Sequence, residues 1–514
     1  MARSARRHLG IAGALWDAVA SASYERRSPE ASVLYRIVRD HLETFRAQSA
    51  SLRDGAGLPR FVDQAFTDFL RCGWLAGGFA RFRCGGCGLD RLVAFSCKGR
   101  AVCPSCSGRR MTERTAHLVD EVLPDVPVRQ WVLSVPYRLR YLLAWDHDLC
   151  RAVAAILSRA IFRVLRERAT DAGVEGGQGG GVVVIQRFGG SLNLNVHFHA
   201  LVLDGVFERL PDGATRFHLT RRLAPIDVDD VLATVEALVA RRLRRAGLDS
   251  ASEDSESLDR WADETPVLAE LAATSVVGGG LVGAPQRVGR GRWLDEPPDD
   301  QVGAGGESRG LVARSQGYSL HAGQVVAAGR RERLEQVCRY VLRPPVAVER
   351  LQLTDSGQVH LTFKQPWRDG TTAVVFDPVT FLGRLAVLVP RPRTNLLLYY
   401  GVLGARSAWR AAVVAHGRGA ADADRPEPHC AGDAAPARAI PTRNASWATL
   451  MRRAFGFDVL SCPRCGGRLR LLALITQAAV IERILVHIGA STAIPRPRPA
   501  RAPPEPRKFA EFAE

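Results

Sequence analysis

Two histidines two residues apart in the stretch LNLNVHFHALVLDG could bind one metal ion. Successive side chains of a β-strand point to opposite faces, so His197 and His199 would share a face with Asn193 and Asn195. The positions between them are apolar and predict a face that packs on a core. Imidazole is a common ligand of divalent metals. A His-x-His pair alone is more often structural than functional. Whether this pair binds a metal ion must therefore be judged from other parts of the sequence.

Paired cysteines suggest a second kind of metal site. Two CxxC pairs are separated by 15 residues, which is the spacing of a four-thiolate zinc site, and they comprise Cys84, Cys87, Cys103 and Cys106. Cys97 lies between the pairs and could replace one ligand, whereas Cys72 is expected to be a packing residue. We therefore predict a zinc ribbon with one ion bound by the two CxxC pairs.

A third CxxC pair, Cys462 and Cys465, provides half of another site. His429 and Cys430 could complete it, which would give a second zinc ion. The chain has 11 cysteines, and their CxxC spacing favours metal binding in a reducing compartment over a disulfide framework.

The segment RRERLEQVCRYVLR predicts an amphipathic helix that carries a tyrosine on its polar side. Helical spacing places four apolar side chains on the opposite, buried side: Leu334, Val337, Cys338 and Val341. Gln336 and Tyr340 share the polar side, with Arg333 and Arg343 nearby, and two prolines end the helix. A phenol beside cations could attack a phosphate, because positive charge lowers the cost of ionising a group whose pKa is normally near 10.

The net charge of +17 favours a polyanionic partner. Nearly all basic residues are arginines, which bind phosphate in a bidentate manner, and Arg109 and Arg110 beside the cysteine pairs are predicted to contact DNA. No run of about 20 apolar residues predicts a membrane span. The N-terminal apolar stretch is interrupted by Asp17, so we expect a cytoplasmic, nucleoid-associated protein without a membrane partner.

The segments that carry the histidine pair and the tyrosine are expected to belong to a fold of mixed helices and strands. Helices are expected over 28–47 and 148–168, and strands over 182–188, 192–207 and 317–326. The expected fold class is α+β, with a central antiparallel sheet flanked by helices and a small zinc ribbon. The expected domains are a helical region (1–70), the zinc ribbon (71–125), a catalytic domain (126–405) with a flexible insertion (about 247–310), a linker (406–445), a CxxC segment (446–494) and a disordered tail (495–514).

Several segments in fixed order resemble the rolling-circle transposases of the IS91 family, whose nuclease belongs to the HUH endonucleases. The nuclease segments are QRFGGSLN, NVHFHALVLDG, GYSLHA, CRYVLRPPVAVERL and KQPWRDGTT. SCKGRAVCPSCSGRR and VRQWVLSVPYRLRYLL resemble the zinc-binding part of that family, and CPRCGGRLRLL resembles a C-terminal extension of some members. The resemblance covers roughly residues 24–405.

The resemblance implies a nuclease site and a reaction. His197 and His199 would hold Mg²⁺ or Mn²⁺, with His321 slightly preferred over Gln186 as the third ligand. Tyr340 would attack single-stranded DNA at element ends and form a 5′-phosphotyrosine link, and a 3′-hydroxyl, including that of target DNA, would reverse the attack. Arg333 and Arg343 would contact the DNA.

One departure from the family pattern restricts the mechanism. Members with two nucleophiles carry tyrosines four residues apart, and here Gln336 occupies the position before Tyr340. The chain is thus similar to the single-tyrosine branch, and the adjacent Tyr399 and Tyr400 are expected to be structural.

Three other functions would use some of the same residues. A replication initiator or relaxase would use the same chemistry at a plasmid origin, a DNA-binding regulator would use only the zinc ribbon, and a metal-dependent hydrolase would cleave without a covalent adduct. The order of motifs favours the transposase.

Overall fold

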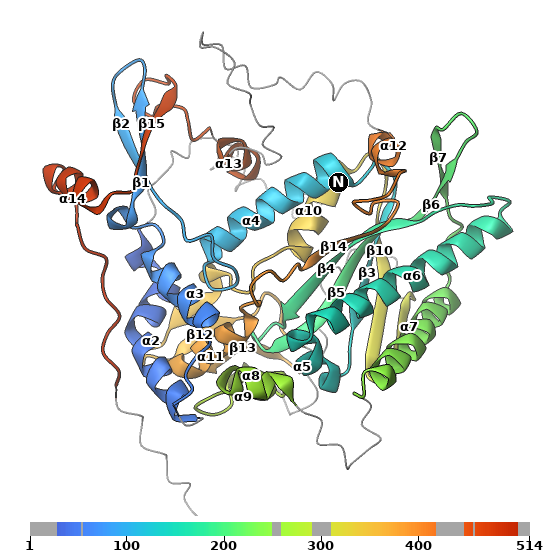
Figure 1. The fold of residues 1–514 in the computed structure, drawn as a ribbon, viewed down its shortest axis with the longest axis horizontal. Helices are drawn as coiled ribbons and strands as arrows, with labels where there is room; N and C mark the ends of the chain where they lie inside the picture. The colour runs from blue at the N-terminus through green and yellow to red at the C-terminus, as the bar shows by residue number, and fades with distance from the viewer. Residues whose placement is uncertain are drawn as a thin grey trace, which may run out of the picture.

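The computed structural model describes residues 28–52, 55–248, 259–289, 310–367, 369–417, 447–455 and 458–501. Helices and antiparallel sheets are mixed, which confirms the predicted α+β class (Figure 1). His429 and Cys430 lie outside the described residues. None of the described helices is long and apolar enough to cross a membrane.

A six-stranded sheet forms the centre of the molecule, and all of its neighbouring strands are antiparallel. In spatial order its strands are β14 (Leu397–Gly401), β4 (Gly180–Phe188), β5 (Leu194–Leu203), β3 (Val128–Ser134), β10 (Tyr318–Val326) and β9 (Val312–Ser315). Every residue of β3, β4 and β5 is buried, because helices cover both faces of the sheet.

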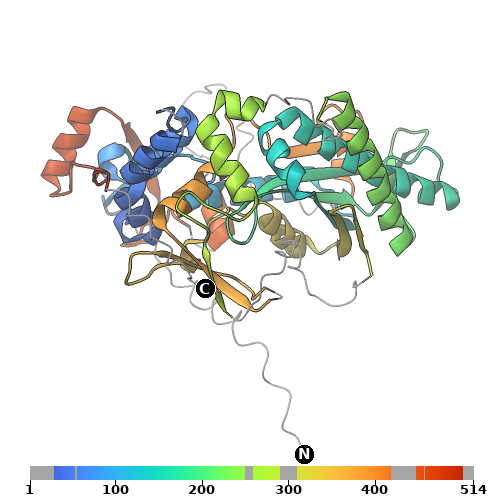
Figure 2. The same cartoon turned by 90° about the horizontal axis from the view of Figure 1, so that it is seen from below.

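The two faces of the central sheet are covered by different helices (Figure 2). One face packs against α5 (Tyr137–Trp145), α6 (His147–Asp171) and α7 (Pro225–Arg245). Asp146 caps α6 by accepting a hydrogen bond from the backbone N–H of Leu149, so the long helix begins at a defined residue. The opposite face lies under α10 (Arg331–Val341), which also packs against α4 (Pro104–His117) and the short π-helical segment Leu118–Val122 that follows α4.

A second layer of helices and a small sheet lie beside the central sheet. The sheet has the order β11 (Leu351–Leu353), β12 (Val359–Thr362), β13 (Thr371–Phe376) and β8 (Gln286–Gly289). The helices of this layer are α2 (Val33–Leu52), α3 (Arg60–Arg71), α8 (Arg260–Glu264), α9 (Pro266–Val276) and α11 (Pro378–Leu388). A separate two-stranded sheet pairs β6 (Gly205–Arg209) with β7 (Thr215–Leu219).

Part of the predicted flexible insertion is packed, so that expectation is wrong for residues 259–289. Trp261 is buried and stacks on Tyr141 and Trp145, with ring centroids 4.7 Å and 5.3 Å apart. Apolar residues of α9, such as Leu268 and Ala272, join the main core. The acidic and glycine-rich composition of the surrounding segment hid this short apolar stretch. Residues 249–258 and 290–309 are not described.

The C-terminal segment folds onto the N-terminal part of the chain. β15 (Leu469–Ile475) pairs with β1 (Phe79–Cys84), which also pairs with β2 (Asp90–Ala94) (Figure 1). The segment also contributes α13 (Trp447–Phe455) and α14 (Ala478–His487), whereas α12 (Arg410–Ala415) precedes it. Residues 495–501, expected to be disordered, lie along α2, where the backbone N–H of Arg498 donates to the carbonyl of Arg39 at 2.8 Å.

Candidate functional site

The polar face of β5 is buried under α10. His197 and His199 are 2% and 1% exposed, and their ring centroids are 5.0 Å apart. The alternate residues Val196, Phe198 and Ala200 belong to the main core on the other side of the sheet. The predicted alternation of polar and apolar faces is therefore observed, but the polar face meets a helix and not solvent.

The helix α10 brings Tyr340 to these histidines. The rings of Tyr340 and His199 are perpendicular, with centroids 6.0 Å apart. Two contacts fix this end of the helix: Gln186 of β4 donates its amide N–H to the carbonyl of Val341 at 2.7 Å, and the Arg343 guanidinium lies 4.3 Å from the centre of the Tyr340 ring. The predicted buried side of α10 is confirmed, since its four apolar residues are all buried.

Burial keeps both histidines neutral. It lowers the pKa of His197 to about 4. Burial, together with the neighbouring His197 and Arg343, lowers the pKa of His199 well below its usual range. Neutral imidazole is the form that binds metal ions, so both side chains are in the ligating state at pH 7.

Several buried lone pairs on this face meet no hydrogen-bond donor among the described residues. They belong to Nε2 of His199 and to the side-chain oxygens of Gln186, Gln130 and Asn195. Such groups normally find a partner, because an unsatisfied buried acceptor costs about 1–3 kcal/mol. His197 directs Nδ1 at the carbonyl of Asn195 at 3.0 Å, which leaves its Nε2 to act as a ligand. A mixed nitrogen and oxygen donor set of this kind fits a divalent cation.

Gln130 lies behind His199, with its amide nitrogen 3.0 Å from Nδ1. A half-turn of this amide exchanges its nitrogen with its oxygen, which has no partner among the described residues and would then accept a hydrogen bond from the Nδ1–H of His199. In that arrangement Gln130 holds the imidazole and leaves Nε2 as a ligand.

The two candidates for a third ligand occupy different places. Gln186 is the direct cross-strand neighbour of His197. His321 is separated from His199 by β3, because both pair with Val132, which puts their backbones roughly 9–10 Å apart. Apart from the cysteines, the described residues contain no three His, Cys, Asp or Glu ligand atoms within 4.8 Å of one another. The geometry favours Gln186, and the preference for His321 is not supported.

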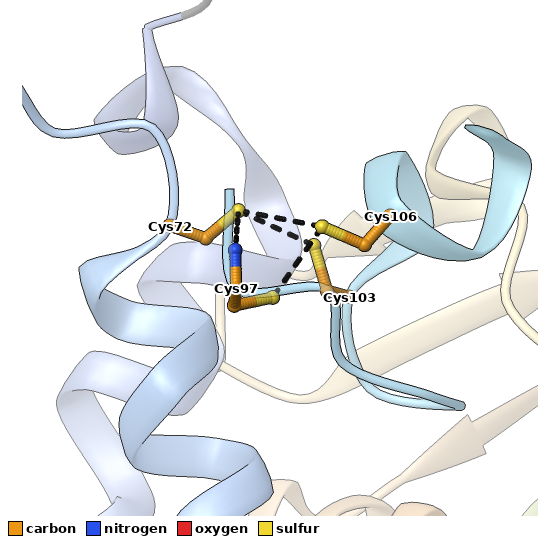
Figure 3. A group of neighbouring side chains, drawn as sticks. All are labelled: Cys72, Cys97, Cys103 and Cys106. Carbon is orange, nitrogen blue, oxygen red and sulfur yellow. Dashed lines mark hydrogen bonds between the residues drawn. The ribbon is translucent and has the colours of Figure 1, made fainter. Parts of the chain in front are cut away.

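Cys72, Cys97, Cys103 and Cys106 form one cluster, here called the inner cluster (Figure 3). The four sulfurs lie within 4.8 Å of one another. Cys72 directly follows α3, whereas Cys103 and Cys106 stand at the start of α4. Hydrogen bonding from Cys103 lowers the pKa of Cys72 to about 6, which gives the cluster a thiolate, the metal-binding form.

Cys84, Cys87, Cys462 and Cys465 form a second cluster, here called the outer cluster. Cys84 lies 3.5 Å from Cys465, and Cys87 lies 3.6 Å from Cys462, measured between sulfurs. Backbone N–H groups of Cys87 and Gly86 lower the pKa of Cys84 to about 6. A Cβ added at Gly467 would lie 3.2 Å from the sulfurs of Cys84 and Cys465, so a side chain there would crowd the cluster.

The predicted zinc site of Cys84, Cys87, Cys103 and Cys106 is wrong in its grouping. The hairpin of β1 and β2 directs the first pair toward β15, whereas Cys103 and Cys106 face the end of α3. Cys72, expected to be a packing residue, belongs to the inner cluster. The number of cysteines gave a clue, because six of them between 72 and 106 are two more than one site needs.

The predicted DNA-contacting arginines lie in different surroundings. Arg343 lies over Tyr340, and Arg110 of α4 is half-buried, whereas Arg109 and Arg333 are exposed. Arg333 donates to the Gln336 side chain at 3.0 Å. Tyr399 and Tyr400 lie on β14, and burial raises the pKa of Tyr400 to about 12.

Two family models match the chain and together cover more than half of it. Residues 37–135 match the transposase zinc-binding domain of IS91, and residues 180–410 match a putative transposase. No curated protein and no solved structure matches. Fold and comparisons thus define a DNA transposase with a zinc-binding domain, and that domain and the clusters support Zn²⁺ as a cofactor. The chain belongs to the IS91 family of transposases.

Proposed function

We propose that this transposase nicks and rejoins single-stranded DNA through a covalent link to Tyr340. The observation that carries the proposal is the packing of Tyr340 against His199, on a buried face where several polar side-chain atoms have no hydrogen-bond partner among the residues that the structure describes. Structural residues rarely leave buried acceptors unsatisfied, so this face is suited to a cation beside the tyrosine.

His197, His199 and Gln186 would hold a divalent cation, Mg²⁺ or Mn²⁺. When bound, such an ion stabilises the negative charge that develops on a phosphate during displacement. Gln186 has a second task, since its amide N–H holds the carbonyl of Val341 and thereby fixes the turn of α10 that carries Tyr340. Arg343 stabilises negative charge on the phenol oxygen from its place over the ring.

The reaction is a displacement at phosphorus. The phenol oxygen of Tyr340 forms a bond to the phosphorus and loses its proton, while the bond to the 3′-oxygen breaks and that oxygen gains a proton. The 5′-phosphate remains on the tyrosine. Attack by another 3′-hydroxyl reverses these steps and joins two strands without a nucleotide cofactor. The substrates would be the element ends and the target DNA.

The single tyrosine limits each subunit to one covalent link at a time. Gln336 occupies the place of a second nucleophile and cannot attack a phosphate in the same way. A replication initiator or relaxase would share this chemistry, but the family match favours transposition.

The test is incubation of the purified protein and Mn²⁺ with labelled single-stranded DNA from an element end, followed by denaturing gel analysis. The wild type should form a protein–DNA adduct, Tyr340→Phe should form none, and Tyr400→Phe is the matched control. His197→Ala should lose the adduct but keep most of its DNA affinity. Cleavage without an adduct would show a hydrolase, and binding without cleavage would show a regulator.

A further inference from the structure

A cavity of about 180 Å³ lies where the zinc-binding domain meets the central sheet. Its walls come from α4, from the end of β4 and from the residues that follow Tyr340, namely 341–345. Gln186, which holds the Tyr340 turn of α10, also lines it. The cavity therefore adjoins the proposed nuclease site.

The walls of this cavity are positively charged. Arg100, Arg110 and Arg114 come from the zinc-binding domain, and Arg343 comes from the segment that follows α10. None of the described residues that line the cavity is an aspartate or glutamate. Burial, followed by the charges of Arg110 and Arg114, lowers the pKa of Arg100. This mutual repulsion is relieved when an anion enters the cavity.

Neutral groups hold these guanidinium groups in place. Arg100 donates to the carbonyl of Thr394 at 2.8 Å, and Arg110 donates to the carbonyl of Lys98 at 2.7 Å. A backbone carbonyl orients an arginine without cancelling its charge. The arginines are thus fixed in direction and keep N–H groups for a phosphate.

The interior of the cavity is largely apolar and includes an aromatic ring. Met111, Phe188, Pro344 and Leu396 contribute to it. The Arg343 guanidinium lies 5.4 Å from the centre of the Phe188 ring and also over Tyr340, so it connects the cavity with the nucleophile. A nucleotide has the matching chemistry, because its base is flat and apolar on its faces and its phosphate is an anion.

We propose that this cavity binds one unstacked nucleotide of the single-stranded substrate, next to the phosphate that Tyr340 attacks. The base packs against Phe188, and Arg110 and Arg114 bind the adjoining phosphate. The zinc-binding domain therefore forms part of the substrate site itself. The identity of the substrate rests on the proposed function, but occupancy of the cavity does not need cleavage.

The test measures binding by the uncleaving Tyr340→Phe protein. Fluorescence anisotropy gives the dissociation constants of a set of oligonucleotides from an element end, each with one abasic site at a different position. One position should weaken binding by about 5-fold or more, because stacking of a single base is lost. In the double variant Tyr340→Phe, Phe188→Leu, the dissociation constant for DNA with the abasic site at that position, divided by the dissociation constant for intact DNA, should fall toward one.

The charge contribution is tested with two arginines, Arg110 of the cavity and the exposed Arg166 of α6, which packs on the other face of the central sheet. Arg110→Ala should weaken binding of intact DNA by about 10-fold, whereas Arg166→Ala, with the same charge change, should weaken it by no more than about 3-fold. Zinc content and thermal unfolding confirm that each variant is folded. Equal losses for both arginines, or an abasic scan without a sensitive position, would overturn the inference.

The two proposals fail separately. An adduct in the wild type without a sensitive abasic position would leave the tyrosine nuclease and remove the nucleotide cavity. A sensitive position that depends on Phe188, without an adduct, would leave the cavity and remove the nuclease.

Discussion

The inner and outer clusters each consist of four cysteines that could bind one metal ion, but they differ in burial and in how far apart their cysteines lie along the chain. The inner cluster uses residues at most 34 positions apart, and three of its four cysteines belong to the main hydrophobic core. The outer cluster joins residues 375 and 381 positions apart, Cys465 is exposed, and only a small apolar group surrounds it. The inner cluster is thus part of the core, whereas the outer cluster fastens one end of the chain to the other.

Loss of the inner cluster should have the largest effect. Cys103→Ser removes a thiolate between α3 and α4, so one zinc ion is lost and the core around Val102 and Cys106 opens. We expect the free energy of unfolding to fall by several kcal/mol, of order 3–5, and the zinc content to fall from about two ions to about one. Thermal unfolding and elemental analysis measure these changes. An unchanged unfolding transition would contradict a role of this cluster in the core.

Loss of the outer cluster should have a smaller and local effect. Cys462→Ser should also remove one zinc ion, but the main unfolding transition should stay within about 1 kcal/mol of the wild type, because the main core is untouched. Hydrogen exchange should become faster in β15 and in the facing strand β1. Adduct formation at Tyr340 should persist. If the main transition falls as far as in Cys103→Ser, the two clusters do not differ as described.

The smallest effect is expected at a second attachment of the C-terminal segment. Arg453 of α13 forms ion pairs with Asp120 and with Glu335 of α10, all partly buried. Arg453→Met should accelerate hydrogen exchange in α13 by a few-fold, equivalent to about 1 kcal/mol or less. Arg452→Met is the matched control, because Arg452 is exposed on the same helix. Equal effects of both variants would show that the ion pairs do not attach α13.

The same ion pairs have a defined pH dependence. Burial tends to raise the pKa of Glu335, but hydrogen bonds from Arg453 and Arg339 outweigh it and lower the pKa. A carboxylate with a lowered folded pKa stabilises the fold above its unfolded pKa, and this contribution is lost as the pH falls through the folded value. The difference between wild type and Arg453→Met should therefore be full at pH 7 and shrink under acid conditions.

The sequence predicted local features well. The alternation of β5 and the amphipathic spacing of α10 follow from periodicity within one element, so the histidine face and the buried side of α10 could be anticipated. Tyr340 was expected on the opposite side, whereas it is partly buried and packs against His199. The CxxC pairs correctly indicated metal sites, because two thiolates at that spacing form half of a tetrahedral site.

Long-range pairing could not be predicted from the sequence. Which CxxC pair joins which depends on the contact of β1 with β15, across more than 370 residues, and no local pattern encodes that contact. The choice between Gln186 and His321 depends on strand order, since only one of their strands neighbours β5. The packed segment around Trp261 was missed because its aromatic partners, Tyr141 and Trp145, lie in another part of the chain.

The outer cluster also sets an order of events during synthesis. Cys87 leaves the ribosome 375 residues before Cys462, which is roughly 20–75 s at ordinary translation rates. Throughout that interval the hairpin of β1 and β2 has two thiols and an open strand edge, although the inner cluster already has all of its ligands. A chain cut short before residue 462 would contain every strand of the central sheet but would leave those thiols without their partners. The outer cluster can therefore form only after Cys465 has been synthesised, long after the inner cluster.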